Sequence, residues 1–164
     1  MVAHATNFKR GVLMASTMRY INIVSRCCSM YRSQRLEGSE LGACHIPYIL
    51  TLCRNPGITQ ETLCKMVYIN KSNVTRALAY LEQHGYVRRE QSETDKRVLL
   101  VYSTEKALSE LPRIRSILKD WNEYITEDIT EEELCAFVAV LEKIAKKAAS
   151  YGELSETAGE GERL

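Results

Sequence analysis

The 164-residue sequence has no hydrophobic run near the roughly 20 residues needed to cross a bilayer. Near the N-terminus, the apolar segment VLMA at residues 12–15 is too short for the hydrophobic region of a signal peptide. Arg19 interrupts the apolar residues that follow it. We therefore expect a cytoplasmic protein without a membrane partner.

Motifs of the common enzyme classes are also missing. The sequence has no glycine-rich phosphate-binding loop, no nucleophile elbow and no HExxH helix. The glutamates at residues 131–133 follow Thr130, a pattern typical of a helix N-terminus rather than of a catalytic carboxylate pair. We expect a protein that is not an enzyme.

The six cysteines include no CxxC pair, and the three histidines are scattered along the chain. In a reducing compartment, such cysteines usually stay as free thiols and serve as small apolar residues. Cys44 and His45 are adjacent, so their side chains diverge on a helix and cannot easily share a metal ion. We expect no disulfide, no bound metal and no cofactor.

Charge is unevenly distributed in a chain whose net charge is only +1. Residues 1–36 hold six basic residues and no acidic one, and residues 65–97 hold seven basic against four acidic residues. From Thr104 onward the chain is acidic. A basic region in a nearly neutral protein is compatible with a dimeric DNA-binding protein.

Apolar residues recur at helical spacing near both ends of the chain. The pattern predicts one long helix over residues 8–35, a second helix over residues 44–53, and further helices over residues 104–125 and from Thr130 onward. Pro112 should disturb the third of these by a kink or a lost hydrogen bond. These terminal helices carry more apolar surface than one compact domain needs.

The middle of the chain predicts a helix-turn-helix followed by a hairpin. Thr59 and Asn70 are good N-cap residues for two successive helices, and Gly85 can end the second helix in the left-handed conformation. Residues 86–90 and 98–102 are typical of two strands, joined by a polar loop. The predicted fold is mainly α, a winged helix-turn-helix with long N- and C-terminal helices and a two-stranded β wing.

The second helix of this motif has a polar side that could enter a DNA major groove. Arginine can bond guanine, asparagine can bond adenine, and hydroxyl groups can bond bases or phosphates. A lysine at a helix N-terminus is well placed for phosphate. Taken alone, these residues could equally form a solvated surface, but the turn, the glycine and the basic hairpin favour DNA contact. The candidates are Lys71, Ser72, Asn73, Thr75 and Arg76.

Four segments together resemble the MarR family of bacterial transcriptional regulators: NPGITQ at 55–60, NVTR at 73–76, LEQHGYV at 81–87 and DKR at 95–97. The resemblance implies a homodimer that binds a pseudo-palindromic double-stranded operator and represses transcription. It also implies three segments: an N-terminal dimerisation helix (1–40), the DNA-binding domain (41–103) and C-terminal dimerisation helices (104–149). Glycines, acidic residues and few apolar residues predict a disordered acidic tail over residues 150–164.

The wing loop carries the strongest single candidate. By the resemblance, Arg97 reaches a minor groove at the tip of the wing, and Asp95 stabilises the wing through an ion pair. Lys96 is a weaker candidate for DNA contact. Arg88 and Arg89 are adjacent on a predicted strand and face opposite ways, so at most one of them readily faces DNA. The alternative is an exposed hairpin with solvated charges.

Two further sites follow from the resemblance alone. Family members often bind small aromatic or phenolic effectors, and His45 and Tyr48, one turn apart on the second helix, could face such a pocket. Other relatives sense peroxides through a thiol of the first helix, where Cys27 and Cys28 lie. The alternatives to a ligand-relieved repressor are therefore a redox-sensing regulator and a winged helix that binds protein instead of DNA.

Overall fold

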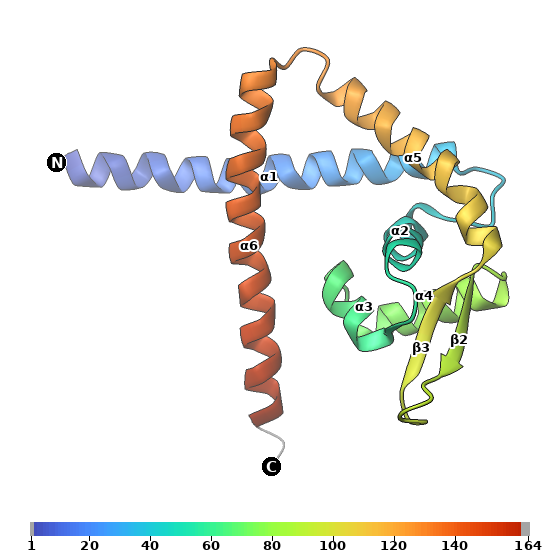
Figure 1. Cartoon of the computed structure of the whole chain (residues 1–164). Helices are drawn as coiled ribbons and strands as arrows, with labels where there is room; N and C mark the ends of the chain where they lie inside the picture. Colours follow the sequence, from blue (N-terminus) through green and yellow to red (C-terminus); the bar gives the residue numbers. More distant parts are fainter. Residues whose placement is uncertain (1, 162–164) are drawn as a thin grey trace. The chain divides into compact units, whose positions relative to one another are not determined.

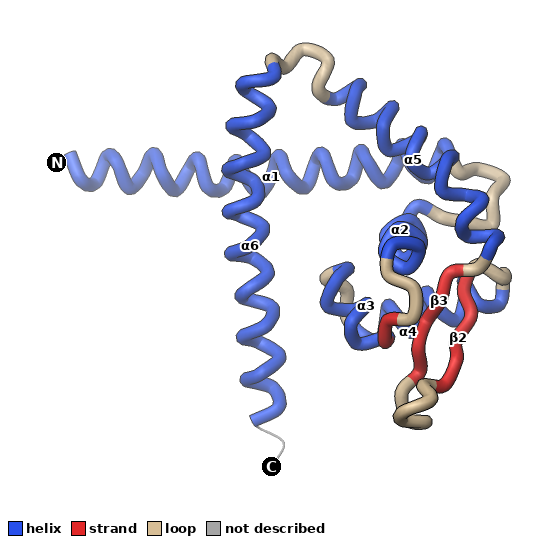
Figure 2. Tube along the Cα trace, viewed as in Figure 1, coloured by secondary structure: helices blue, strands red, loops and turns tan. Residues whose placement is uncertain are grey.

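The computed structural model describes residues 2–161 of the chain, and the side chains of residues 16–151. The chain divides into a larger compact unit that ends at Trp121 and a smaller one that begins at Asn122. Figure 1 labels the α-helices and the strands β2 and β3, and Figure 2 separates helices from strands. The elements are, in order, α1 (Val2–Arg35), a 3₁₀ turn η1 (Ala43–His45), α2 (Ile46–Arg54), β1 (Ile58–Thr59), α3 (Gln60–Val67), α4 (Lys71–Gln83), β2 (Val87–Gln91), β3 (Leu99–Ser103), α5 (Glu105–Ile125) and α6 (Glu131–Gly161).

The core of the larger unit is formed by one apolar face from each of several elements. These faces come from α2, α3, α4, β3 and α5, and the side chains at the centre of the cluster have no exposed surface. Among the described residues, the buried set contains no polar or charged side chain. The hydrophobic effect therefore fixes these elements against one another. The fully buried residues are Ile49, Leu52, Leu63, Val74, Leu78, Leu81, Val101, Ala107 and Ile114.

The two helices of the helix-turn-helix begin at the predicted caps. The Thr59 hydroxyl accepts a hydrogen bond from the Thr62 backbone N–H at 3.0 Å. The Asn70 side-chain oxygen accepts one from the Asn73 N–H at 2.9 Å. Between the helices, Tyr68 adopts the left-handed conformation with φ of 53°, which is uncommon for a residue with a side chain. Gly85 follows α4 with φ of 74°, as predicted for the helix stop.

The wing is part of a three-stranded antiparallel sheet with the order β1-β3-β2. Val87 pairs with Ser103 and Gln91 with Leu99, so β2 and β3 form the predicted hairpin, which extends beyond the neighbouring helices in Figure 1. The short strand β1, which pairs Ile58 with Val101, was not predicted. Two residues are too few to show alternation in a sequence, so only the completed sheet reveals this strand.

The position before β1 requires a glycine, Gly57, because of its backbone conformation and a close neighbour. It has φ of 78°, and a Cβ atom at this position would lie 2.9 Å from Cε1 of Tyr102. Its N–H donates to the Val101 carbonyl oxygen at 2.9 Å, which extends the β1–β3 pairing. Any other residue would combine an unfavourable backbone conformation with a steric clash.

The helix α5 runs through Pro112 without a break. Proline has no N–H to donate, so one backbone hydrogen bond of the helix is lost there, as predicted. At the start of α5, the Thr104 hydroxyl donates to the Gly85 carbonyl oxygen at 2.7 Å and accepts from the Ala107 N–H at 3.4 Å. This single side chain caps α5 and ties it to the end of α4.

The helix α6 belongs to the smaller unit and opens with the predicted capping box. The Thr130 hydroxyl accepts from the Glu133 N–H at 3.3 Å, and the Glu133 carboxylate accepts from the Thr130 N–H at 3.0 Å. The helix continues to Gly161, so the structure differs up to that residue from the disordered tail predicted for residues 150–164. Extending an existing helix by a residue costs much less free energy than nucleating a new helix. Local amino-acid composition does not reflect this difference.

None of the helices among the residues described is long and apolar enough to span a membrane.

Candidate nucleic-acid interface

The predicted DNA-contacting residues of α4 lie together on the exposed side of that helix. Lys71, Ser72, Asn73, Thr75 and Arg76 are all exposed. The opposite side of α4 consists of residues of the buried core. The core therefore fixes α4 by one face and presents the other face to solvent.

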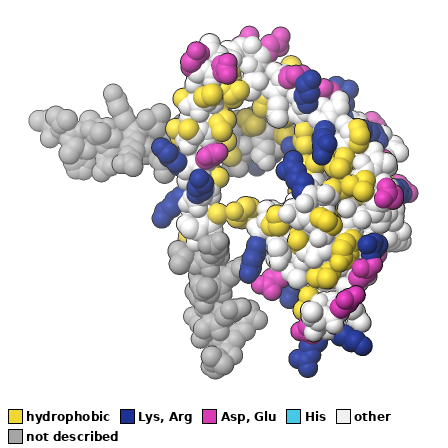
Figure 3. Space-filling view, in the orientation of Figure 1, with side chains coloured by type: hydrophobic (Ala, Val, Ile, Leu, Met, Phe, Trp, Pro, Cys, Tyr) yellow, Lys and Arg dark blue, Asp and Glu magenta, His cyan; other side chains and the backbone are white. Residues whose placement is uncertain are grey.

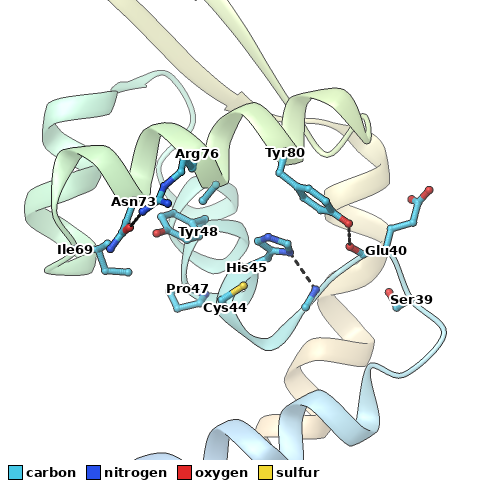
Figure 4. A pocket seen from close by; sticks show the side chains of 12 residues that line it. Ser39, Glu40, Cys44, His45, Pro47, Tyr48, Ile69, Asn73, Arg76 and Tyr80 are labelled. Carbon is cyan, nitrogen blue, oxygen red and sulfur yellow. Dashed lines mark hydrogen bonds between the residues drawn. The ribbon is translucent and has the colours of Figure 1, made fainter.

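Two of these side chains contact each other. The Arg76 guanidinium donates a hydrogen bond to the side-chain oxygen of Asn73, one helical turn away. The contact is drawn in Figure 4. It reduces the number of conformations that either side chain samples, while further donors of both groups remain available for a base edge.

Thr75 is engaged differently from its neighbours. Its hydroxyl donates to the Lys71 carbonyl oxygen at 2.8 Å and accepts from the Gln60 side-chain nitrogen at 2.6 Å. The structure therefore adds Gln60, the first residue of α3, to the surface formed by α4. Gln60 is not among the residues predicted from the sequence, because a contact between two helices leaves no local pattern.

The wing loop carries the predicted basic residues at its tip. Lys96 and Arg97 are exposed there, and Figure 3 shows Lys and Arg side chains gathered at the tip of the hairpin. Both residues lie between β2 and β3, away from the core. The wing therefore presents positive charge where the hairpin extends farthest from the helices.

Asp95 stabilises the wing loop by a different bond from the predicted one. Its carboxylate accepts a hydrogen bond from the Arg97 backbone N–H at 2.9 Å, and the Val98 N–H donates to the Asp95 carbonyl oxygen at 2.9 Å. In the described part of the chain, the ion pairs do not include Asp95 and the Arg97 side chain. A backbone bond suits a short carboxylate in a tight turn, and it leaves the Arg97 guanidinium directed elsewhere.

Arg88 and Arg89 face opposite sides of the sheet, as the strand geometry predicts. The Arg88 guanidinium lies 4.5 Å from the centre of the Tyr102 ring, its cross-strand neighbour, and it also pairs with Glu90. Arg89 pairs with Glu82 of α4, with Nε donating at 3.0 Å. The hydrogen bond from Arg89 lowers the pKa of Glu82. Arg89 therefore joins the wing to α4 rather than facing DNA.

An open pocket of about 860 Å³ lies between the segment that leads into α2 and the middle of α4. Both predicted effector residues line it, as Figure 4 shows, together with Asn73 and Arg76 of the candidate DNA surface. His45 ends the 3₁₀ turn just before α2, so it precedes the helix on which it was predicted to lie. Tyr48 is 3% exposed and also belongs to the core cluster. The pocket thus shares a wall with α4, the helix that carries the candidate DNA surface.

His45 and Tyr80, which line this pocket, belong to a stack of three rings that also includes His84. The His45 and Tyr80 ring centres are 4.6 Å apart, and the Tyr80 and His84 centres are 3.9 Å apart. The Gly42 N–H donates to Nδ1 of His45 at 3.0 Å, and the Tyr80 hydroxyl donates to the Glu40 carbonyl oxygen at 2.8 Å. Burial, and then the nearby His84, lower the pKa of His45 below its ordinary value of 6.5. A neutral His45 therefore connects the segment before α2 to α4.

The six cysteines are free thiols, and none lies in the fully buried core. Cys53 and Cys64 pack against the core cluster, whereas Cys27, Cys44 and Cys135 are exposed. The expectation that the cysteines serve as small apolar residues therefore fits Cys53 and Cys64, but not the three exposed thiols. Cys28 is half-buried on α1, next to Cys27.

Among the described residues, no group of three or more His, Cys, Asp or Glu side chains is arranged to hold a metal ion.

Fold and surface together define a winged helix-turn-helix with a polar helix face and a basic wing. A model of the MarR family matches residues 42–98. YybA, an uncharacterised HTH-type transcriptional regulator of Bacillus subtilis (strain 168), is 25% identical over 133 residues, which cover 81% of this chain and 89% of that protein.

Solved structures agree with this match over most of the chain. A MarR transcriptional regulator from Methanosarcina mazei Go1 is 26% identical with a TM-score of 0.77, and the match covers 84% of this chain and 99% of that one. A MarR family transcriptional regulator from Listeria monocytogenes, crystallised in complex with 26mer DNA, is 25% identical with a TM-score of 0.77, over 81% and 89% of the two chains. The family model, the curated relative and the solved structures all support a MarR family winged helix transcriptional regulator. Family and fold are those of regulators, not of enzymes.

The geometry around His45 predicts how stability depends on pH. Because its folded pKa lies below the unfolded value of 6.5, the unfolded state binds more protons between the two values. The stability that neutral His45 contributes is complete above about pH 6.5 and is lost as pH falls through the folded pKa. The substitution His45→Asn keeps an acceptor for the Gly42 N–H and removes the titration, so its free energy of unfolding should fall less between pH 7 and pH 5.

Urea unfolding across this pH range measures the difference. Both proteins retain the other residues of the pocket and of the ring stack, so the difference between the two pH profiles reports on residue 45. Parallel pH profiles for the two proteins would contradict the prediction.

Proposed function

We propose that this protein binds a specific double-stranded operator, with α4 in the major groove and the wing tip against the adjacent minor groove. The observation that carries the proposal is the exposed face of α4, which is held by the core on one side and flanked by the basic wing. Lys71, at the start of α4, and Ser72 are placed for phosphate, and Asn73 and Arg76 for base edges. The Listeria relative was crystallised with DNA, which supports this use of the fold.

Arg97→Ala tests the role of the wing in DNA binding. We expect weaker binding to DNA from upstream of the protein's own gene, and a slope of affinity against salt concentration that is smaller by about 1. Fluorescence anisotropy over a salt series measures both. The matched control is Arg115→Ala, which removes the same charge from an exposed position on α5.

Two results would separate the proposal from its rival. Selective binding that weakens only in Arg97→Ala supports an operator-binding regulator. Equally weak binding of the wild-type protein to every DNA at physiological salt contradicts it and favours a winged helix that binds another protein.

We further propose that the protein acts as a homodimer on a pseudo-palindromic operator, in which half-sites lie about 10 bp or a multiple of one helical turn apart. The support is apolar surface that the single chain leaves uncovered. On α6, Phe137, Val140 and Ile144 are 58%, 55% and 37% exposed, and they share one side of the helix. On α1, Met18, Ile23, Val24 and Met30 are also exposed. In this proposal, residues 1–40 and 104–149 serve dimerisation, and residues 41–103 bind DNA in the bacterial cytoplasm.

Phe137→Glu tests the dimer. A charged side chain at the centre of an apolar interface should reduce the mass measured by sedimentation equilibrium from two chains to one. The control Lys146→Glu places the same residue on the opposite side of α6, since nine positions correspond to about two and a half helical turns. A wild-type protein with the mass of one chain at micromolar concentration would contradict the proposal.

Finally, we propose that a small aromatic or phenolic effector in the pocket beside His45 and Tyr48 weakens operator binding and relieves repression. The pocket wall includes Asn73 and Arg76, so an occupant would contact the residues assigned to the bases. Coupling of about 1–3 kcal/mol, typical of allosteric pairs, would reduce affinity roughly 5- to 150-fold. A cavity of about 860 Å³ is sufficient for a ligand of this class.

A titration of the protein–operator complex with benzoate and with phenol tests the effector. Release by either compound, weakened in Ala77→Leu, which narrows the pocket, supports it. No release by any aromatic compound at millimolar concentration contradicts it. A parallel titration with peroxide tests the thiol alternative: release that is abolished in the Cys27→Ser, Cys28→Ser double variant would favour that reading.

A further inference from the structure

Gln60 lies outside α4 and the wing, and its side chain joins the candidate DNA surface through a hydrogen bond. It is the first residue of α3, and its side-chain nitrogen donates to the Thr75 hydroxyl on α4 at 2.6 Å. The same hydroxyl donates to the Lys71 carbonyl oxygen at 2.8 Å. Thr75 is therefore fixed by α4, and Gln60 is fixed by Thr75.

The bond to Thr75 uses only part of the hydrogen-bonding capacity of Gln60. A glutamine side chain has two N–H donors and one carbonyl oxygen. One N–H is directed at Thr75, and within the described part of the chain no hydrogen bond is recorded for the second N–H or for the oxygen. A parallel donor and acceptor on one amide is the pattern that pairs with N7 and the N6 amino group of adenine.

Thr75 has less remaining hydrogen-bonding capacity than Gln60. Its hydroxyl already donates one hydrogen bond and accepts another, so a further contact from this residue would come mainly from its methyl group. At this point of the surface, Gln60 rather than Thr75 therefore has the polar groups that can bond a base. Because Gln60 is half-buried and held in place, ordering it on DNA costs little conformational entropy.

We propose that Gln60, supplied by α3 rather than by α4, reads an adenine in each operator half-site, and that Thr75 is its positioning residue. This inference rests on the proposed operator binding. It predicts a specificity determinant that lies outside the recognition helix.

The competing interpretation is that the Gln60–Thr75 bond only ties α3 to α4. A purely structural bond would affect every operator equally, whereas a base-reading residue affects one base pair. The two interpretations therefore differ in a measurement of specificity, and a measurement of affinity alone does not separate them.

The experiment measures the affinity of each protein for the operator and for a panel of operators with one symmetric base-pair change per half-site. Gln60→Ala should lose about 5- to 150-fold on the intact operator, the range for one bidentate base contact. The Gln60→Ala protein should bind the intact operator and the operator changed at the adenine that Gln60 reads with the same affinity. Gln83→Ala, the same substitution at an exposed position at the end of α4, is the control and should leave the panel unchanged.

Two more variants give readouts that a structural role would not move. Gln60→Glu replaces the amide with a carboxylate that can only accept, which removes both the bond to Thr75 and the match to adenine, so the preference for adenine at that base pair should be lost. Thr75→Val keeps the shape and the methyl group but removes the hydroxyl, so discrimination at that base pair should weaken while other positions keep theirs.

A uniform loss of affinity across the whole panel in Gln60→Ala, with a lower melting temperature, would overturn the inference in favour of a structural bond. An unchanged panel would overturn it as well. Wild-type protein that does not distinguish the operator from unrelated DNA would instead reject the proposed function itself, and the inference with it.

Discussion

The burial of one face of α4 is the constraint on which the rest of the site depends. Val74, Leu78 and Leu81 have no exposed surface, and they anchor the helix among α2, α3, β3 and α5. Burying side chains of this size stabilises a fold by about 1.5–3 kcal/mol each. With this face fixed, the rotation of α4 about its axis is determined, and so is the set of side chains that meets solvent. Recognition by the polar face is thus a consequence of packing by the apolar face.

Three parts of the structure meet on α4: the candidate DNA surface, the pocket and the wing. The first turn of α4 belongs to the candidate DNA surface, Tyr80 forms part of the pocket wall, and Glu82 is bonded to Arg89 of the wing. The pocket wall, the segment before α2 and the wing are therefore all connected to the same rigid element. Such a shared element is what an allosteric proposal requires, because both sites must bias a single structural change.

Much of this arrangement could be predicted from the sequence, since it depends on local signals. Thr59, Asn70 and Gly85 mark helix ends through the chemistry of their own side chains, or through the lack of one, and all three have the expected role. The polar side of α4 follows from helical periodicity alone. The comparison with the MarR family then supports the fold and the class of function.

The features that the sequence did not predict depend on contacts between distant residues. Gln60 meets Thr75 across the turn, β1 exists only by pairing with β3, and Arg89 meets Glu82 across two elements. Asp95 shows a related limit: the residue was identified, but its partner is a backbone N–H instead of a guanidinium. Residue type indicates what a side chain can bond, and only the fold determines which group it reaches.

The ion pair between Glu82 and Arg89 has a consequence for how ionic strength acts on this protein. The two side chains are 37% and 26% exposed, so dissolved ions reach the pair and screen it. Salt therefore weakens two attractions together, that of basic residues for phosphate and that of the wing for α4. The hairpin should become freer to move relative to the helix under the same conditions in which the DNA is released. Dissociation in salt would then be steeper than the number of phosphate contacts alone requires.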